Sequence, residues 1–329
     1  MRQERFEAEQ APPWDEYQRL LARLEGRPSA RGAPSGMDLG GFPRLYRQLC
    51  ADYALARGRG YSPGLIADLH DLVRRGHRRL YQRRSRPFAS ALVFATDTFP
   101  RTLRRHARLF WMGLGLLFLP MIAMGLAVHA DPEIIYSLID SAQVAELESQ
   151  YDPAGRKPGR ETDRQADTDF AMFGFYIMNN IGIGFRGFAG GLLFGLGSAL
   201  ILVFNGLSIG AVAGHLTRLD HGGTFWPFVS GHGPYELTAI AISGAAGLLL
   251  GQALLAPGNR TRLAALRLNA RDAVILVGGA AGMLVLAAVV EAFWSAGPAP
   301  AAIKYGVGAV GWVLVALYLG LAGRGARGS

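Results

Sequence analysis

The chain has 329 residues, of which 50% are hydrophobic, and it carries a net charge of +9 and one cysteine. The single cysteine, Cys50, excludes intrachain disulfides and cysteine-based metal clusters. Only Lys157 and Lys304 among the 34 basic residues are lysines, and this arginine bias does not by itself indicate nucleic-acid binding, so we expect no nucleic-acid partner.

Residues 1–86 are predicted to form a small cytoplasmic domain of helices. Apolar residues recur at helical spacing in three groups, which are Trp14, Tyr17, Leu20, Leu21 and Leu24, then Leu45, Leu49 and Tyr53, then Leu65, Ile66, Leu69, Leu72 and Val73. Ser62 followed by Pro63 is typical of a helix start, and residues 26–41 are rich in Gly, Pro and Ser, as in a flexible loop. We expect the arginines of residues 74–84 to form a solvated surface or, alternatively, to contact anionic lipid headgroups.

Residues 87–108 are predicted to lie along the membrane surface. From Phe88 to Phe99 apolar residues recur every three or four positions, which favours an interfacial amphipathic helix. Pro100 is expected to interrupt this helix before an arginine-rich flank that ends at Arg108. Arginines next to a membrane span are typical of its cytoplasmic side.

Residues 109–329 are predicted to form a polytopic, all-α membrane bundle. Five apolar segments are candidates for helices that cross the hydrocarbon core: residues 109–129, 188–204, 237–255, 274–291 and 305–321. The first residues lack the apolar core of a secretory signal, so we expect the first span to act as an uncleaved anchor. Residues 131–169 contain ten acidic and four basic residues and are expected to form an acidic external loop.

The number of crossings is five or six. With five spans and a cytoplasmic N-terminus, the arginines of residues 260–271 and those of the tail would both lie outside, against the positive-inside rule. If residues 170–183 also cross, these arginines and the C-terminus move to the cytoplasm. That segment is short and contains Asn179 and Asn180, so a re-entrant or interfacial helix is the alternative.

Small residues at four-residue intervals predict close helix packing. Gly206, Gly210 and Gly214 are one such series, and repeated glycine on one face lets membrane helices approach closely. Gly206–Gly210 also matches the GxSxG pattern of serine hydrolases through Ser208, but the nearest histidine, His215, lies two helical turns along the same face. We therefore expect a packing face and no enzymatic activity.

Polar residues within or beside the spans are the candidate functional or structural residues: Asn179, Asn180, Asn205, His232, Glu236 and Glu291. Pro234 and Glu236 fit the first turn of the span that follows His232, which favours a capped, hydrogen-bonded junction. Ionisable groups in a membrane usually face a partner or a cavity, so a proton or metal site is the alternative. We assign no catalytic, cofactor-binding or metal-binding residue and expect no cofactor.

The order and spacing of these residues resemble the stage II sporulation protein M family. The resemblance rests on Asn179-Asn180, on Asn205-Gly206 with Gly210, on His232-Gly233 with Glu236, and on Glu291-Ala292-Phe293, and it extends to Phe42-Pro43-Arg44-Leu45-Tyr46-Arg47. Pro234-Tyr235 before Glu236 is a departure, because family members commonly carry two apolar residues there.

The resemblance implies an integral protein of the bacterial inner membrane. The family's namesake in spore formers is a scaffold that recruits peptidoglycan-degrading enzymes during engulfment. Longer members with an N-terminal cytoplasmic domain tend to occur beside a MoxR-type AAA+ ATPase in organisms that do not sporulate. We therefore expect a membrane scaffold or assembly factor related to the cell envelope, with the lipid bilayer and protein partners as its contacts. The alternative is a transporter or channel-like protein that uses a buried site at His232 and Glu236.

Overall fold

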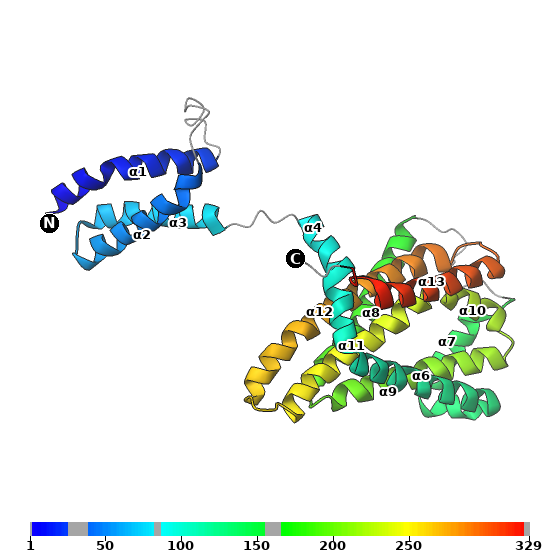
Figure 1. Cartoon of the computed structure of the whole chain (residues 1–329). Coiled ribbons are helices and arrows are strands. Elements are labelled where there is room, and N and C mark those ends of the chain that lie inside the picture. The colour runs from blue at the N-terminus through cyan, green and yellow to red at the C-terminus, as the bar shows by residue number, and fades with distance from the viewer. Residues whose placement is uncertain (1, 26–38, 82–86, 155–165, 326–329) are drawn as a thin grey trace. The chain divides into compact units, whose positions relative to one another are not determined.

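The computed structural model describes residues 2–25, 39–81, 87–154 and 166–325, and every regular element in these ranges is a helix. The all-α class is thus confirmed. The chain divides into two compact units, Met1–Ser90 and Ala91–Ser329 (Figure 1). The predicted loop at residues 26–41 falls largely outside the described residues, apart from a short 3₁₀ helix at Leu39–Gly41.

In the described part of the first unit, three long helices surround their own core. They are α1 (Gln3–Glu25), α2 (Phe42–Gly58) and α3 (Pro63–Tyr81). The core contains the predicted apolar faces, with Tyr17, Leu20, Leu21, Leu45, Leu49, Leu69 and Leu72 all buried. The ring of Tyr17 stacks on Phe42 with centroids 5.1 Å apart, and the Ser62 hydroxyl accepts a hydrogen bond from the Leu65 amide at the start of α3. Local periodicity and capping therefore account for this unit.

The segment that leads into the bundle contains both α-helical and π-helical turns. It consists of α4 (Pro87–Val93), a π-helical stretch (Phe94–Thr98) and α5 (Phe99–Arg105). The predicted interruption at Pro100 is wrong, because the chain stays helical through it. A proline ring clashes with the carbonyl four residues earlier, and the wider π turn before Pro100, in which the Phe99 amide donates to the Phe94 carbonyl, accommodates the ring.

The second unit is a bundle, and in its described residues five helices are long and apolar enough to cross a membrane. They are α6 (Ala107–Ala130), α9 (Leu196–Arg218), α11 (Gly233–Leu255), α12 with its π-helical extension (Arg262–Ser295) and α13 (Ala301–Leu321). Between α6 and α9 lie a 3₁₀ helix (Pro132–Ser137), α7 (Ser141–Tyr151), α8 (Ala166–Ala189) and a 3₁₀ turn (Gly190–Leu192). The short helix α10 (Gly222–Ser230) precedes α11.

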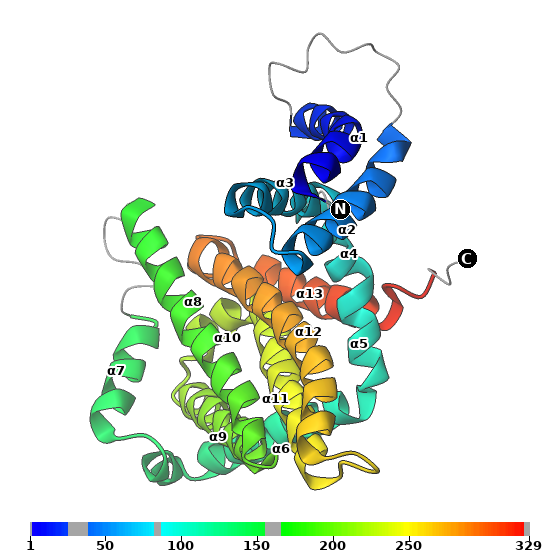
Figure 2. The ribbon, with the colours of Figure 1, turned by 90° about the vertical axis from the view of Figure 1, so that its left-hand side faces the viewer.

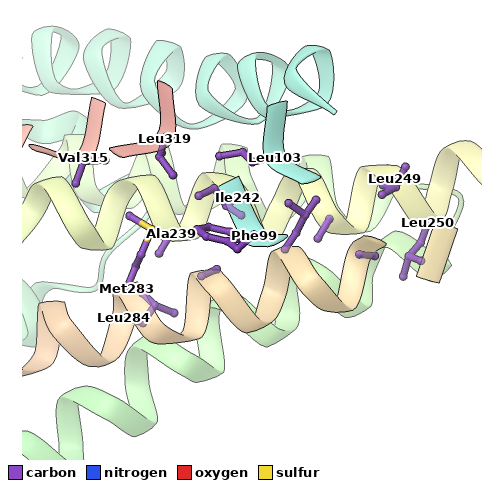
Figure 3. Packing of buried hydrophobic residues seen from close by; sticks show 14 residues of the cluster. Phe99, Leu103, Ala239, Ile242, Leu249, Leu250, Met283, Leu284, Val315 and Leu319 are labelled. Atoms are coloured by element: carbon purple, nitrogen blue, oxygen red, sulfur yellow. The ribbon is translucent and has the colours of Figure 1, made fainter. Parts of the chain in front are cut away.

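The central helix is α11, which is buried along most of its length. Its apolar side chains pack with those of α5, α12 and α13 in the cluster of Figure 3, where Phe99 and Ile242 are among the most buried. Large apolar side chains on the outer faces of the bundle, such as Leu119, Phe204 and Val313, are exposed. A bundle with apolar residues on the inside and the outside is suited to a lipid environment.

Glycine contacts give the relative directions of the helices. The α-carbons of Gly206, Gly210 and Gly214 on α9 face the backbone of Leu117, Met121 and Gly125 on α6, in that order, so α6 and α9 are parallel. Figure 2 shows α8 lying along α11 and α12. Gly184 and Gly191, in α8 and the turn after it, lie against Ser243 and Gly247 of α11, so α8 and α11 are parallel as well.

The direction of α11 relative to α9 follows from two further contacts. Gly244 and Gly247 of α11 face Leu202 and Ser198 of α9, so these two helices are antiparallel. Consequently α8, which lies between α6 and α9 in the sequence, runs in the direction opposite to both of them.

Arginines of α5 bind the end of α13. Arg104 donates to the carbonyl oxygens of Leu319 at 2.8 Å and Ala322 at 2.6 Å, and Arg101 donates to that of Gly323 at 2.7 Å. The last carbonyls of a helix have no partner within the helix, so these arginines satisfy groups that would otherwise lack one. The basic flank of the first span and the end of α13 therefore lie at the same end of the bundle.

Candidate functional site

Three of the predicted residues meet at the opposite end of the bundle. His232 immediately precedes α11, Glu236 lies in the first turn of α11, and Glu291 lies in the π-helical extension of α12. One ligand atom from each side chain, an imidazole nitrogen or a carboxylate oxygen, lies within 4.8 Å of the others. His232 is 5% exposed, and both glutamates are partly buried. The fold thus brings together His232 and Glu291, which are 59 positions apart in the sequence.

The His232 side chain does not cap α11. No capping hydrogen bond comes from the imidazole, whereas the His232 carbonyl accepts the amides of Tyr235 and Glu236. Instead, Nδ1 lies 3.1 Å from the Ser295 hydroxyl, and Nε2 lies 3.7 Å from a Glu236 carboxylate oxygen. The Phe228 ring and the imidazole pack in a T-shaped arrangement, with ring centroids 5.6 Å apart. Ser295 and Phe228 therefore fix the orientation of the ring.

Ser295 and Lys304 also belong to this junction, although neither was among the predicted candidate residues. The Lys304 ammonium is buried and donates to the Ser295 carbonyl at 2.6 Å, and the Ser230 hydroxyl donates to the Lys304 carbonyl at 3.2 Å. A cleft beside the junction is lined by Phe228, Ser295 and Lys304, among others. The rarity of lysine in this chain and the position of Lys304 inside an apolar helix were the available signals.

The carboxylates of the junction have few partners. Within the described part of the chain, the Glu291 carboxylate forms no hydrogen bond or ion pair, and the Glu236 carboxylate has only the 3.7 Å contact with His232. Glu291 lies in one of the π-helical segments, which occur frequently at functional sites. Two carboxylates this close repel each other when both are ionised, so a proton or a cation between them would be favourable.

The three predicted asparagines make other contacts. The Asn179 amide donates to the Asn180 side-chain oxygen at 3.1 Å, and the buried Asn180 amide nitrogen has no hydrogen-bond partner among the residues that the structure describes. The Asn205 amide donates to the Ile201 carbonyl of its own helix at 2.7 Å. Within the described residues, none of these asparagines forms a hydrogen bond with His232, Glu236 or Glu291.

A second polar contact fixes the segment between α6 and α8. His215 of α9 lies 2.7 Å from the Glu148 carboxylate of α7. The Thr224 hydroxyl donates to the Tyr151 carbonyl, and the Tyr151 ring packs on Phe225. Burial raises the pKa of Tyr151. The imidazole of His215 is thus held by a carboxylate from another helix.

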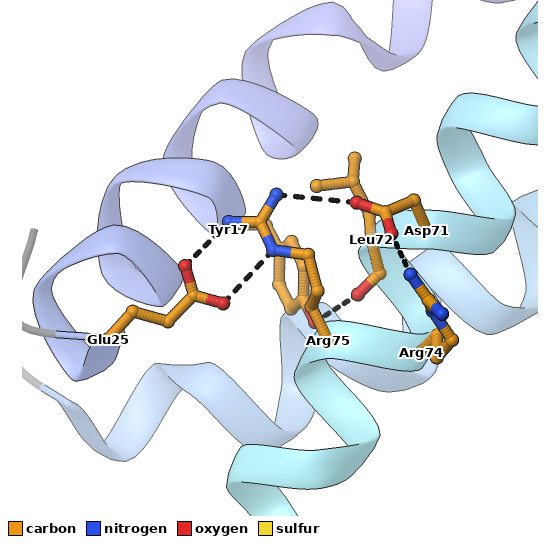
Figure 4. Close-up of polar contacts among 6 residues, drawn as sticks. All are labelled: Tyr17, Glu25, Asp71, Leu72, Arg74 and Arg75. Atoms are coloured by element: carbon orange, nitrogen blue, oxygen red, sulfur yellow. Dashed lines mark hydrogen bonds and ion pairs between the residues drawn. The ribbon is translucent and has the colours of Figure 1, made fainter.

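The arginine-rich face of α3 is partly engaged within the first unit (Figure 4). Arg75 donates to both carboxylate oxygens of Glu25, at 3.0 and 2.7 Å, and this hydrogen bonding raises the pKa of the guanidinium. Arg74 donates to Asp71 at 2.8 Å and lowers the pKa of that carboxyl. Arg78 and Arg79 are exposed. These two arginines could contact an anionic surface, whereas Arg75 serves the stability of the unit.

Family comparisons agree with the two-part organisation. The family model for stage II sporulation protein M matches residues 114–296, and a model described as a domain of unknown function (DUF8413) matches residues 4–82. No curated protein and no solved structure matches the chain. The first match covers more than half of the chain and includes all six candidate residues, from Asn179 to Glu291. The chain therefore belongs to the stage II sporulation protein M family.

Proposed function

We propose that the chain is an integral membrane scaffold that anchors and organises partner proteins at the cytoplasmic membrane, in a process related to the cell envelope. The observation that carries the proposal is the separate first unit, which has its own apolar core and is attached to a bundle of membrane-type helices. Such a unit can bind a partner while the bundle holds it at the bilayer. A MoxR-type AAA+ ATPase is the partner class that the family resemblance suggests, and the role requires no catalysis.

The helix directions support a topology of six crossings. Because α6 and α9 are parallel, the chain must return across the bundle between them, and α8 runs in the required direction. A helix of 24 residues is about 36 Å long, enough for a hydrocarbon core of about 30 Å. With the arginines of α5 in the cytoplasm, this topology places both termini there and the His232 junction on the outer side.

Cysteine labelling tests this topology. Gly222→Cys and Asn259→Cys are introduced separately into a Cys50→Ser background, and each is exposed to a thiol reagent that does not cross the membrane. Six crossings predict labelling of intact cells at position 222 and labelling at position 259 only after the membrane is opened. The opposite pattern would restore the five-span topology.

Crosslinking in cells tests the scaffold. The full-length chain and a chain lacking residues 1–86 are purified gently after crosslinking, and partners are identified by mass spectrometry. We expect at least one partner to be retained only by the full-length chain. A full-length Arg78→Ala, Arg79→Ala variant serves as a matched control that keeps the core of the first unit and removes only exposed charge. Recovery of the same proteins with both lengths would exclude the first unit as the docking surface.

A second candidate function is transport through the bundle. It is favoured by the convergence of His232, Glu236 and Glu291 beside a cleft, since transporters place ionisable groups inside membrane bundles. In proteoliposomes, Glu236→Gln would abolish flux while folding and partner binding persist. Unchanged flux in that variant would exclude Glu236 as a coupling group.

A further inference from the structure

We infer that His232, Glu236 and Glu291 together bind one divalent transition-metal ion of the zinc type at the end of the bundle where α11 begins. The site differs from the docking surface of the first unit, and it can exist whether or not the chain acts as a scaffold.

The donor set fits this class of ion. One imidazole nitrogen and two carboxylate oxygens suit zinc and its neighbours in the first transition row, whereas magnesium and calcium prefer sites made of oxygen alone. Zinc binds nitrogen and oxygen ligands at about 2.0–2.2 Å, which places tetrahedral ligand atoms about 3.4 Å apart. The present separations, up to 4.8 Å, become compatible after small rotations of the two glutamate side chains.

The histidine is oriented as a metal ligand would be. A metal-binding imidazole usually donates its other N–H to a nearby acceptor, which fixes the tautomer and the direction of the ring. The Nδ1 of His232 lies 3.1 Å from the Ser295 hydroxyl, and Nε2 lies on the side of Glu236. When Nδ1 carries the hydrogen, the lone pair of Nε2 points to the carboxylates.

The negative charge of the two carboxylates favours a bound cation at the junction. The two carboxylates face each other in a largely dry environment, and the ammonium of Lys304 donates to the Ser295 carbonyl. Pairing with a divalent ion removes the repulsion between the carboxylates and offsets their desolvation. Three protein ligands leave a fourth position for water.

Metal binding to the full-length protein tests the inference. The detergent-purified chain is stripped with a chelator, and zinc binding is then measured by calorimetry and by elemental analysis after gel filtration. We expect one equivalent of zinc per chain and a rise in thermal stability on zinc addition. Glu291→Gln and Glu236→Gln are each expected to weaken binding at least 100-fold, whereas Ser295→Ala, which only positions the imidazole, is expected to weaken it about 10- to 100-fold.

A matched control separates this site from other histidine–carboxylate pairs. Glu148→Gln removes the partner of His215 and leaves the junction intact, so the zinc equivalent is expected to remain. Zinc binding that is lost in Glu148→Gln but retained in Glu291→Gln would overturn the assignment. So would the absence of any zinc equivalent in a correctly folded chain, which would indicate a proton shared by the two carboxylates. If Glu291→Gln fails to fold, the Ser295→Ala affinity decides.

Discussion

The contact between α10 and α13 leaves no room for a side chain at Gly308, and this provides a quantitative test of the bundle. A Cβ atom added at Gly308 would lie 2.5 Å from the Ser230 carbonyl oxygen and 3.0 Å from its carbonyl carbon. A Cβ atom added at Gly306, on the same helix, would have no neighbouring atom within 4 Å. Gly308→Ala is therefore expected to destabilise the bundle, and Gly306→Ala is its matched control.

The magnitude follows from the displacement. Real Cβ atoms essentially never come closer than 3.0 Å to another heavy atom, so α10 and α13 must separate by at least 0.5 Å at this point. A gap of about 0.5–1 Å already removes a quarter to a half of each contact's dispersion energy. Overpacking of this kind typically costs about 1–3 kcal/mol. At Gly306 the alanine instead gains up to about 1 kcal/mol, because it favours the helix more than glycine does.

Unfolding in mixed detergent micelles measures both variants. The free energy of unfolding is obtained from a denaturing-detergent titration followed by tryptophan fluorescence. We expect Gly308→Ala to unfold at a lower detergent fraction than the original chain, and Gly306→Ala to unfold at the same fraction or a higher one. Equal midpoints for the two variants would refute the close approach of α13 to Ser230.

Three further predictions concern charged groups. Glu25→Gln replaces a carboxylate that is 14% exposed and paired with an arginine, so it should lower the stability of the first unit by about 1–3 kcal/mol, as measured by hydrogen exchange over α1 and α3 in the full-length chain. Burial raises the pKa of Asp52, whose carboxylate accepts a hydrogen bond from Trp14. The stability of this unit should therefore fall as the pH rises from the ordinary carboxyl pKa of about 4 through the raised value. Asp52→Asn should remove that part of the pH dependence. Arg104→Ala leaves the carbonyls of Leu319 and Ala322 without this donor, so amides at the end of α13 should exchange faster, while unchanged protection would contradict the capping role.

Local patterns were sufficient to predict most of the helices. The buried face of α1 with Tyr17, Leu20 and Leu21, the start of α3 after Ser62, and four of the five predicted spans follow from periodicity, capping and length. The predicted span at residues 188–204 is wrong, because α8 ends at Ala189, a 3₁₀ turn follows, and α9 begins only at Leu196, after Gly195 in the left-handed conformation. The candidate residues His232, Glu236 and Glu291 were selected because charge is costly in a membrane, and the fold brings these three together. Whether they act in function stays a prediction.

The remaining features depend on distant parts of the chain. Ser295 contacts His232 across 63 positions, and Ser230 contacts Lys304 across 74, so no local pattern indicates either pair. The π-helical stretch before Pro100 was missed because a proline in a helix is normally read as an interruption. The direction of α8 could not be predicted either, because it follows only from the contacts of its glycines with α11.

The bond between α5 and the end of α13 has a consequence for biosynthesis. Arg104 and Leu319 are separated by 215 positions, so α5 leaves the ribosome long before its carbonyl acceptors exist. Until α13 has been inserted, the guanidinium groups lack these carbonyl acceptors, and we expect lipid phosphates to bind them in the meantime. Insertion of α13 would then replace the phosphates by backbone carbonyls, so that α5 and α13 are joined only at that stage.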